Sequence, residues 1–142
     1  GSDWRLNMDS VRILQEIAGK HGVEIAIENV HELIPFVLKS VEDFSRFYDE
    51  LNDDLSLTLD VGHANLNQQI QAFITTFSDK IVHVHASDNK GNYDAHLGIG
   101  YGTVNWTNVA EALKSIGYSG AVMLESVRDI EESLQRLQKI FL

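Results

Sequence analysis

Four residues of metal-binding types each close a short run in which bulky aliphatic residues alternate with small or polar ones. They are Glu28 (VEIAIE), Asp60 (LSLTLD), His85 (IVHVH) and Glu125 (GAVMLE). Because the carboxyl ends of parallel strands meet at one edge of a sheet, we expect these side chains to converge there. Three carboxylates at one point would repel one another and take up protons if no cation lay between them. The pattern therefore predicts a divalent-cation site, with Zn²⁺ or Mn²⁺ as the preferred ion and Co²⁺ or Mg²⁺ as further options.

A second group of ligand-type residues lies in the expected loops. His63 follows Asp60 by three residues, and Gly62 between them lets the backbone turn sharply. Asp94 and His96 are two residues apart in a segment expected to be extended, so that both side chains face one way. These three residues either hold another cation, or bind substrate, or brace a long loop through hydrogen bonds.

Other residues that could take part in binding or catalysis also have a simpler structural interpretation. Lys90 and Arg128 follow strand-end residues at short range, and they either contact an anionic substrate or are solvated surface charges. The glycines of 98–102 do not directly follow a strand and open a helix, which argues against a dinucleotide site. We interpret His83 as a hydrogen-bonded core residue and Trp106 as a packing anchor.

Helical and strand-like segments alternate along the chain. Apolar residues at helical spacing predict a helix over Met8–His21, with Asn7 or Asp9 as its cap and Gly22 at its end. A pattern that approximates a capping box, from Ser40 to Asp43, precedes the next helix. The expected order is helix 8–21, strand 23–28, a loop containing Pro35, helix 41–51, strand 55–60, helix 68–77, strand 81–85, a glycine-rich loop over 91–102, helix 107–116, strand 120–125 and helix 130–142.

Strands separated by helices predict right-handed βαβ crossovers and a parallel sheet. Four such units form either a small open α/β sheet or part of a (β/α)8 barrel. Strands of an open sheet that is covered on both faces are continuously apolar, whereas LSLTLD and IVHVH alternate. Because a complete barrel takes about 250 residues, we expect the 142 residues of this chain to form a parallel (β/α)4 half of a TIM barrel.

Composition sets further limits on the partners. Acidic residues outnumber basic ones by 21 to 11 and give a formal net charge of −10, which opposes binding to a phosphate backbone. There is no cysteine, which excludes disulfides and thiolate metal sites. We therefore expect a cytoplasmic protein without a membrane partner, with Gly1 and Ser2 as a tag remnant and 3–142 as a single half-barrel domain.

Five motifs occur in order along the chain, and together they resemble one known superfamily. They are IEN at 27–29, LDVGH at 59–63, HVHASDN at 83–89, DAHLGIGYG at 94–102 and LES at 124–126. The set resembles the xylose isomerase-like TIM-barrel superfamily, which includes sugar-phosphate isomerases and epimerases and the endonuclease IV family. The resemblance implies that these motifs belong to strands five to eight of the family barrel, whose first half does not appear in this sequence.

The resemblance also implies ligand sets for metal ions. Four residues match the metal ligands of the isomerase and epimerase branch, namely Glu28, Asp60, His85 and Glu125. Three match additional zinc ligands of the endonuclease branch, namely His63, Asp94 and His96.

The activity that the resemblance implies is a metal-dependent isomerase or epimerase of a sugar or sugar phosphate. Glu28 and Glu125 would move a proton between adjacent carbons through a metal-stabilised enediolate, and His63 would orient a hydroxyl. Two alternatives remain open: a zinc-dependent, endonuclease IV-like phosphodiesterase acting on abasic DNA, and a catalytically idle half-barrel. Because a half-barrel leaves both outer strands unpaired, we expect a homodimer of half-barrels or a complex with the missing N-terminal half.

Overall fold

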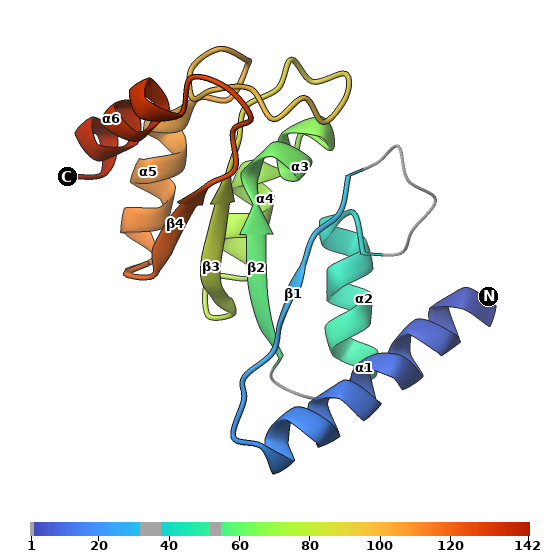
Figure 1. The fold of residues 1–142 in the computed structure, drawn as a ribbon. Helices are drawn as coiled ribbons and strands as arrows, with labels where there is room; N and C mark the ends of the chain where they lie inside the picture. The colour runs from blue at the N-terminus through green and yellow to red at the C-terminus, as the bar shows by residue number, and fades with distance from the viewer. Residues whose placement is uncertain (1, 32–37, 52–54) are drawn as a thin grey trace.

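A computed structural model describes residues 2–31, 38–51 and 55–142; the expected loop position of Pro35 and the first residue of the proposed tag remnant lie outside these ranges. Four strands form one parallel sheet in chain order (Figure 1), which confirms the expected α/β half-barrel arrangement. The strands are β1 (Ala26–Glu28), β2 (Ser56–Asp60), β3 (Ile81–Ala86) and β4 (Ala121–Leu124). The helices are α1 (Ser2–Lys20), α2 (Val41–Leu51), α3 (Val61–Leu66), α4 (Ile70–Thr76), α5 (Trp106–Ser115) and α6 (Ile130–Phe141).

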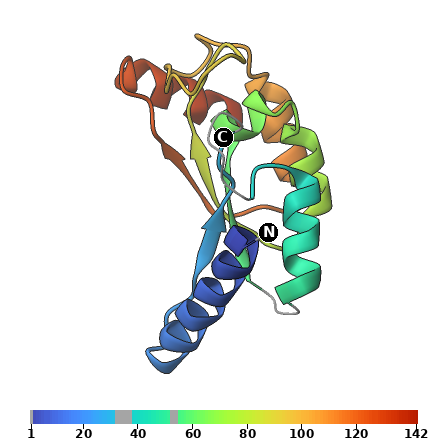
Figure 2. The ribbon, with the colours of Figure 1, turned by 90° about the vertical axis from the view of Figure 1, so that its right-hand side faces the viewer.

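The sheet has one face packed on helices and one face that is more open. Figure 2 shows α2, α4 and α5 along the same side of the sheet. Leu57, Leu59 and Val84 are fully buried in one cluster with Phe44 and Phe73 from α2 and α4. The small or polar residues that alternate with these aliphatic ones along the strands lie on the other face. The alternation in the sequence thus separates a helix-packed face from the face on which the strand-end residues lie.

Helix α1 begins earlier than the sequence predicts. Asn7 and Asp9, the expected caps, lie inside it, because the apolar face continues back to Trp4, which is 8% exposed. The Trp4 indole donates a hydrogen bond of 2.7 Å to Glu50 Oε2 and ties the first turn of α1 to α2. The expected end is confirmed: Gly22, just after the helix, has a φ of +66°.

The start of β1 differs from the sequence-based expectation, whereas the start of α2 agrees with it. The strand expected over 23–28 is shorter, since Val23 is 60% exposed and pairing with β2 begins at Ala26. The capping pattern before α2 is confirmed. Ser40 Oγ accepts from the Asp43 backbone N–H, and Asp43 Oδ2 accepts from the Ser40 N–H.

The helix expected over 68–77 is confirmed as α4 (Ile70–Thr76), but a further helix, α3 (Val61–Leu66), precedes it and was not predicted. Gln68 between the two helices has a φ of +55°. Helix α3 starts directly at the end of β2, where Asp60 Oδ1 accepts from the His63 N–H at 2.7 Å. Gly62 lies in this helix rather than in a sharp turn. Its role is close approach, because a Cβ there would lie 2.7 Å from Ser87 Oγ.

Exposed apolar side chains gather along the two edges of the sheet. On the β1 side, α1 exposes a stripe that is 50–69% accessible, formed by Leu6, Ile13, Leu14 and Ile17. On the β4 side, residues 48–66% accessible are Met123, Val127, Ile130 and Leu134. None of the helices in the described ranges combines the length and the hydropathy that crossing a membrane requires.

Candidate metal centre

The four strand-end residues meet at the carboxyl edge of the sheet. Asp60 and His85 are partners in the β2–β3 register, and the Glu125 N–H extends the β4 ladder by donating to Ala86 O at 2.9 Å. Ligand atoms of Glu28, Asp60 and His85 all lie within 4.8 Å of one another. His85 Nδ1 stands between two carboxylates, 3.4 Å from Glu28 Oε1 and 3.2 Å from Glu125 Oε1. The fold therefore brings together all four residues that the sequence singles out.

Two buried polar atoms in this cluster have no hydrogen-bond partner among the described residues. They are Asp60 Oδ2 and His85 Nδ1. Burial raises the pKa of Asp60 to about 6, against the opposing effect of His63. A divalent cation would use both unpartnered atoms and would offset the cost of burying the carboxylate. The donor set, three carboxylates and one imidazole, fits Zn²⁺ or Mn²⁺.

Asn29, which the sequence analysis does not single out, holds the ends of β1 and β2 together. Its side chain is fully buried. Oδ1 accepts from the Asp60 N–H at 2.8 Å, and Nδ2 donates to Asp60 O at 3.0 Å. This pair of hydrogen bonds positions Asp60 beside Glu28. The available signal was its place directly after Glu28 in the IEN motif.

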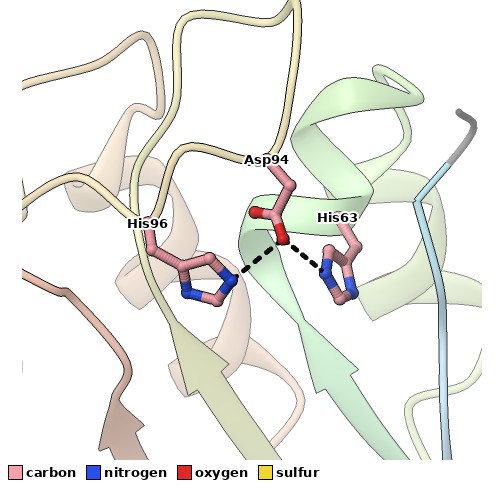
Figure 3. Close-up of side chains that lie close together, drawn as sticks. All are labelled: His63, Asp94 and His96. Atoms are coloured by element: carbon pink, nitrogen blue, oxygen red, sulfur yellow. Dashed lines mark hydrogen bonds and ion pairs between the residues drawn. The ribbon is translucent and has the colours of Figure 1, made fainter.

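The second group predicted from the sequence also comes together (Figure 3). Asp94 Oδ2 lies 3.2 Å from His63 Nε2 and 2.9 Å from His96 Nε2. The other ring nitrogen of each histidine faces a backbone carbonyl: His63 Nδ1 lies 2.8 Å from Asn29 O, and His96 Nδ1 lies 3.0 Å from Glu125 O. A backbone carbonyl oxygen can only accept a hydrogen bond, so each of the two rings carries its hydrogen on Nδ1 and donates it there. When neutral, both histidines thus present the Nε2 lone pair toward Asp94, which suits a cation.

The electrostatics of this second cluster follow from its internal hydrogen bonds. Burial disfavours the charged His63 ring, but the bond to Asp94 and the charge of Asp60 outweigh it and raise the pKa of His63 to about 9. Burial likewise opposes ionisation of Asp94, yet its bond to His63 keeps the pKa of Asp94 below its ordinary value. The expectation that 94–96 is extended is wrong. His96 has a φ of +44°, and this left-handed turn folds its ring back toward Asp94.

Two further histidines differ from their expected surroundings. His83 is half-buried rather than a core residue, and its ring stands edge-on to that of His85 at 5.1 Å. The His31 ring lies 5.4 Å from the His63 ring, although the sequence suggests no partner for it. The imidazoles therefore form a wider group around the two clusters.

The two basic side chains predicted to contact substrate lie outside these clusters. Lys90 and Arg128 are exposed in the segments that follow β3 and β4. Among the described residues, neither forms a hydrogen bond or an ion pair with the cluster side chains. Their role as substrate contacts remains a prediction.

A buried carboxylate that the sequence analysis passes over organises the long loop after β3. Asp88 is fully buried and accepts hydrogen bonds from the N–H groups of Gly100 and Val104 and from Trp106 Nε1. Trp106 is 4% exposed, which confirms it as a packing anchor. Asp88 therefore helps to fix the base of the loop that carries Asp94 and His96.

Comparison with known proteins gives one family and several relatives. The family profile described as "xylose isomerase-like TIM barrel" matches residues 2–140. An uncharacterised protein of Methanocaldococcus jannaschii is 35% identical over 133 residues, which cover 92% of this chain and 51% of that protein. The D-psicose 3-epimerase of Ruminiclostridium cellulolyticum is 25% identical over 125 residues, which cover 87% of this chain and 41% of that protein.

Solved structures share the same fold. The crystal structure of a D-tagatose 3-epimerase-like protein superimposes with a TM-score of 0.89 at 31% identity, covering 96% of this chain and 54% of that chain. The structure of the IolI protein with a bound zinc atom gives a TM-score of 0.75 at 26% identity, with the same coverage. The chain thus spans about half the length of the proteins it matches.

Proposed function

The chain belongs to the xylose isomerase-like TIM-barrel family, and from this premise we propose that it carries the metal-dependent, proton-transferring centre of a sugar epimerase or isomerase. The observation that carries the proposal is the convergence of Glu28, Asp60, His85 and Glu125 at the carboxyl edge of the sheet. TIM-barrel enzymes place their active sites at this edge. Because the chain spans about half of its relatives, the activity belongs to a barrel completed by further strands.

Burial separates the roles of the four residues. The Asp60 side chain is 1% exposed and the His85 side chain 17% exposed, so we assign them to holding a divalent cation. When bound, the cation would polarise a sugar carbonyl and lower the pKa of the adjacent C–H. Glu28 and Glu125 also contribute ligand oxygens, but they are 38% and 28% exposed and remain accessible to a sugar.

We assign Glu28 and Glu125 as the acid–base pair. They come from the two outer strands of the sheet and approach His85 Nδ1 from different elements. One carboxylate would remove a proton from the carbon next to the carbonyl, and the other would return a proton on the other face or at the adjacent carbon. His63, whose ring lies 3.6 Å from Glu28 Oε1, would orient a substrate hydroxyl.

The names of the relatives support a ketose as the substrate class. They include D-psicose 3-epimerases and a D-tagatose 3-epimerase-like protein, and the zinc in the IolI structure supports a divalent ion. We therefore propose a ketose or its phosphate, with inversion next to the keto group.

Two measurements test this proposal. Titration calorimetry with Mn²⁺ and Zn²⁺ should give one tight site in the four-residue cluster, weakened at least tenfold in Glu28→Gln and Glu125→Gln. NMR in D2O should then show loss of the C3 proton of D-psicose in the metal-loaded barrel that this chain forms with its completing strands. Glu111→Gln, an exposed carboxylate on α5, is the matched control. Absence of metal binding would overturn the proposal, whereas binding without proton exchange would favour an idle half-barrel.

The cluster of His63, Asp94 and His96 favours a second candidate function. We propose that these residues hold an additional cation, since Asp94 Oδ1 is buried without a partner and both Nε2 atoms face the same carboxylate. Several zinc ions would suit phosphodiester cleavage of abasic DNA. The net charge of −10 weighs against this function. Incubating an abasic duplex with the zinc-loaded protein separates the two activities.

We also propose that the exposed apolar edges bind a second half-barrel. The α1 stripe and the β4 edge flank strands that each pair with one neighbour in the described sheet. A second copy related by a two-fold axis would pair β1 with β4 on both sides. Light scattering after size exclusion should give a dimer at micromolar concentration, and a monomer would leave a separate N-terminal half as the partner.

A further inference from the structure

We propose that the groove between α5 and α6 binds a small amphipathic anion, an apolar body that carries a phosphate or a carboxylate. This site is independent of the candidate metal centre and shares none of its residues. The groove has a volume of about 780 Å³, within the range of small-molecule sites. It is lined by residues of the loop after β3 and of both helices, which Figure 1 shows side by side at the β4 end of the sheet.

The floor of the groove is apolar and well packed. Ile99, Val104, Trp106 and Ala110 line it, and each is at most 8% exposed. The Trp106 ring is held in place by its hydrogen bond to Asp88. These side chains therefore offer a preformed surface for an apolar body rather than one that must first rearrange.

The charge of the groove is opposite to that of the molecule. Lys114, Arg136 and Lys139 line it, three of the 11 basic residues of the chain, together with Glu111, one of the 21 acidic residues. The rest of the molecule carries the large acidic excess, so an anion is repelled over most of the surface and attracted here. Because Arg136 pairs with Glu132, the positive excess of the groove comes from Lys114 and Lys139 against Glu111, and it favours an anionic ligand.

Arg136 is fixed in the groove by contacts on three sides. Nη1 donates to Ile99 O at 2.6 Å, Nη2 pairs with Glu132 at 2.6 Å, and the guanidinium lies 4.8 Å from the Tyr101 ring centre. Gly100 makes room for it: a Cβ there would lie 2.5 Å from Nη1, and its φ is +82°. The glycine-rich segment therefore shapes this groove.

The remaining positive groups come from the two helices. Lys114 Nζ reaches across from α5 to Ile140 O at 3.3 Å, which leaves its other hydrogens free to donate. Lys139 is exposed and forms no ion pair with any residue in the described ranges. The first turn of α5, at Trp106 and Thr107, lines the groove as well and adds the partial positive charge of a helix N-terminus.

The test uses 1-naphthyl phosphate as the probe, titrated into the ¹⁵N-labelled chain and followed by backbone amide shifts. We expect shifts at Gly100, Thr107 and Lys114 and weaker binding as salt rises from 20 to 200 mM. The double variant Lys114→Gln/Lys139→Gln should weaken binding at least fivefold. The matched control, Arg5→Gln/Lys20→Gln, removes two charges from exposed positions of α1 and should leave the affinity unchanged.

Two further ligands test the two halves of the proposal. Neutral 1-naphthol and inorganic phosphate should each bind at least fivefold more weakly than 1-naphthyl phosphate. The proposal is overturned if naphthol binds equally well, if phosphate binds equally well, if the shifts map to α1, or if both double variants lose the same affinity. None of these results depends on metal binding or on epimerase activity.

Discussion

Replacing Asn29 by alanine should destabilise the protein far more than the loss of two hydrogen bonds usually does. The substitution leaves the N–H and the C=O of Asp60 without the partners that Asn29 supplies at 2.8 and 3.0 Å in a fully buried site. Each buried unpaired peptide group costs about 1–3 kcal/mol, so the loss of both partners should lower the free energy of unfolding by about 2–6 kcal/mol. That is a large part of the about 5–15 kcal/mol of a typical domain.

Asn65→Ala is the matched control for this prediction. The Asn65 amide also makes two hydrogen bonds, to Asn89 Oδ1 at 2.8 Å and to Thr103 Oγ1 at 3.0 Å, but at a partly exposed position where water replaces them. Its loss should cost about 1 kcal/mol or less. Urea denaturation of both variants measures the difference. Equal losses would refute the reasoning that the buried amide clamp joins β1 to β2.

Other perturbations have equally definite expected outcomes. Gly62→Ala should lower the unfolding free energy by about 1–3 kcal/mol, because the new Cβ would lie 2.7 Å from Ser87 Oγ. Gly19→Ala on α1 should raise the unfolding free energy by about 0.5–1 kcal/mol, because a Cβ there would have no neighbouring atom within 4 Å. Mn²⁺ at 100 times its Kd should raise the unfolding free energy by about 2.7 kcal/mol in thermal or urea unfolding, and EDTA should reverse this increase. If Mn²⁺ stabilises Asp60→Asn as much as the parent protein, the proposed site is wrong. Burial raises the pKa of Tyr118 to about 12, so its contribution to stability is complete below pH 10 and is lost as pH rises toward 12. After allowance for its partial exposure this loss is about 1 kcal/mol, and a pH series of unfolding curves should show it in the parent but not in Tyr118→Phe.

The parts of the fold that could be predicted are those in which sequence pattern and packing coincide. Leu57, Leu59 and Val84 alternate with polar residues and are buried against helices, so periodicity alone located the faces of β2 and β3. Helix α3 escaped prediction because VGHANL has no amphipathic pattern. Its start depends on the Asp60 side chain capping the His63 N–H, a contact that exists only once β2 ends there.

The donors of the candidate site were predictable, whereas the groups that orient them were not. Glu28, Asp60 and His85 are in phase with their strands, and a parallel sheet brings strand ends together whatever the details of packing. The Asn29 clamp and the Asp88 brace depend on which backbone groups the fold places beside them. A side-chain amide or carboxylate that hydrogen-bonds to nearby backbone groups does not follow a helix or strand period, so periodicity in the sequence cannot reveal it.

The four strand-end donors lie at the ends of four successive neighbouring strands, from Glu28 on β1 to Glu125 directly after β4. The proposed chelation therefore needs residues of this stretch alone. Enclosing the proposed sugar away from bulk solvent would require further atoms that face the open side of the sheet, where Met123 is 50% exposed. A different covering segment could accordingly change the substrate while the four proposed metal ligands stay in place.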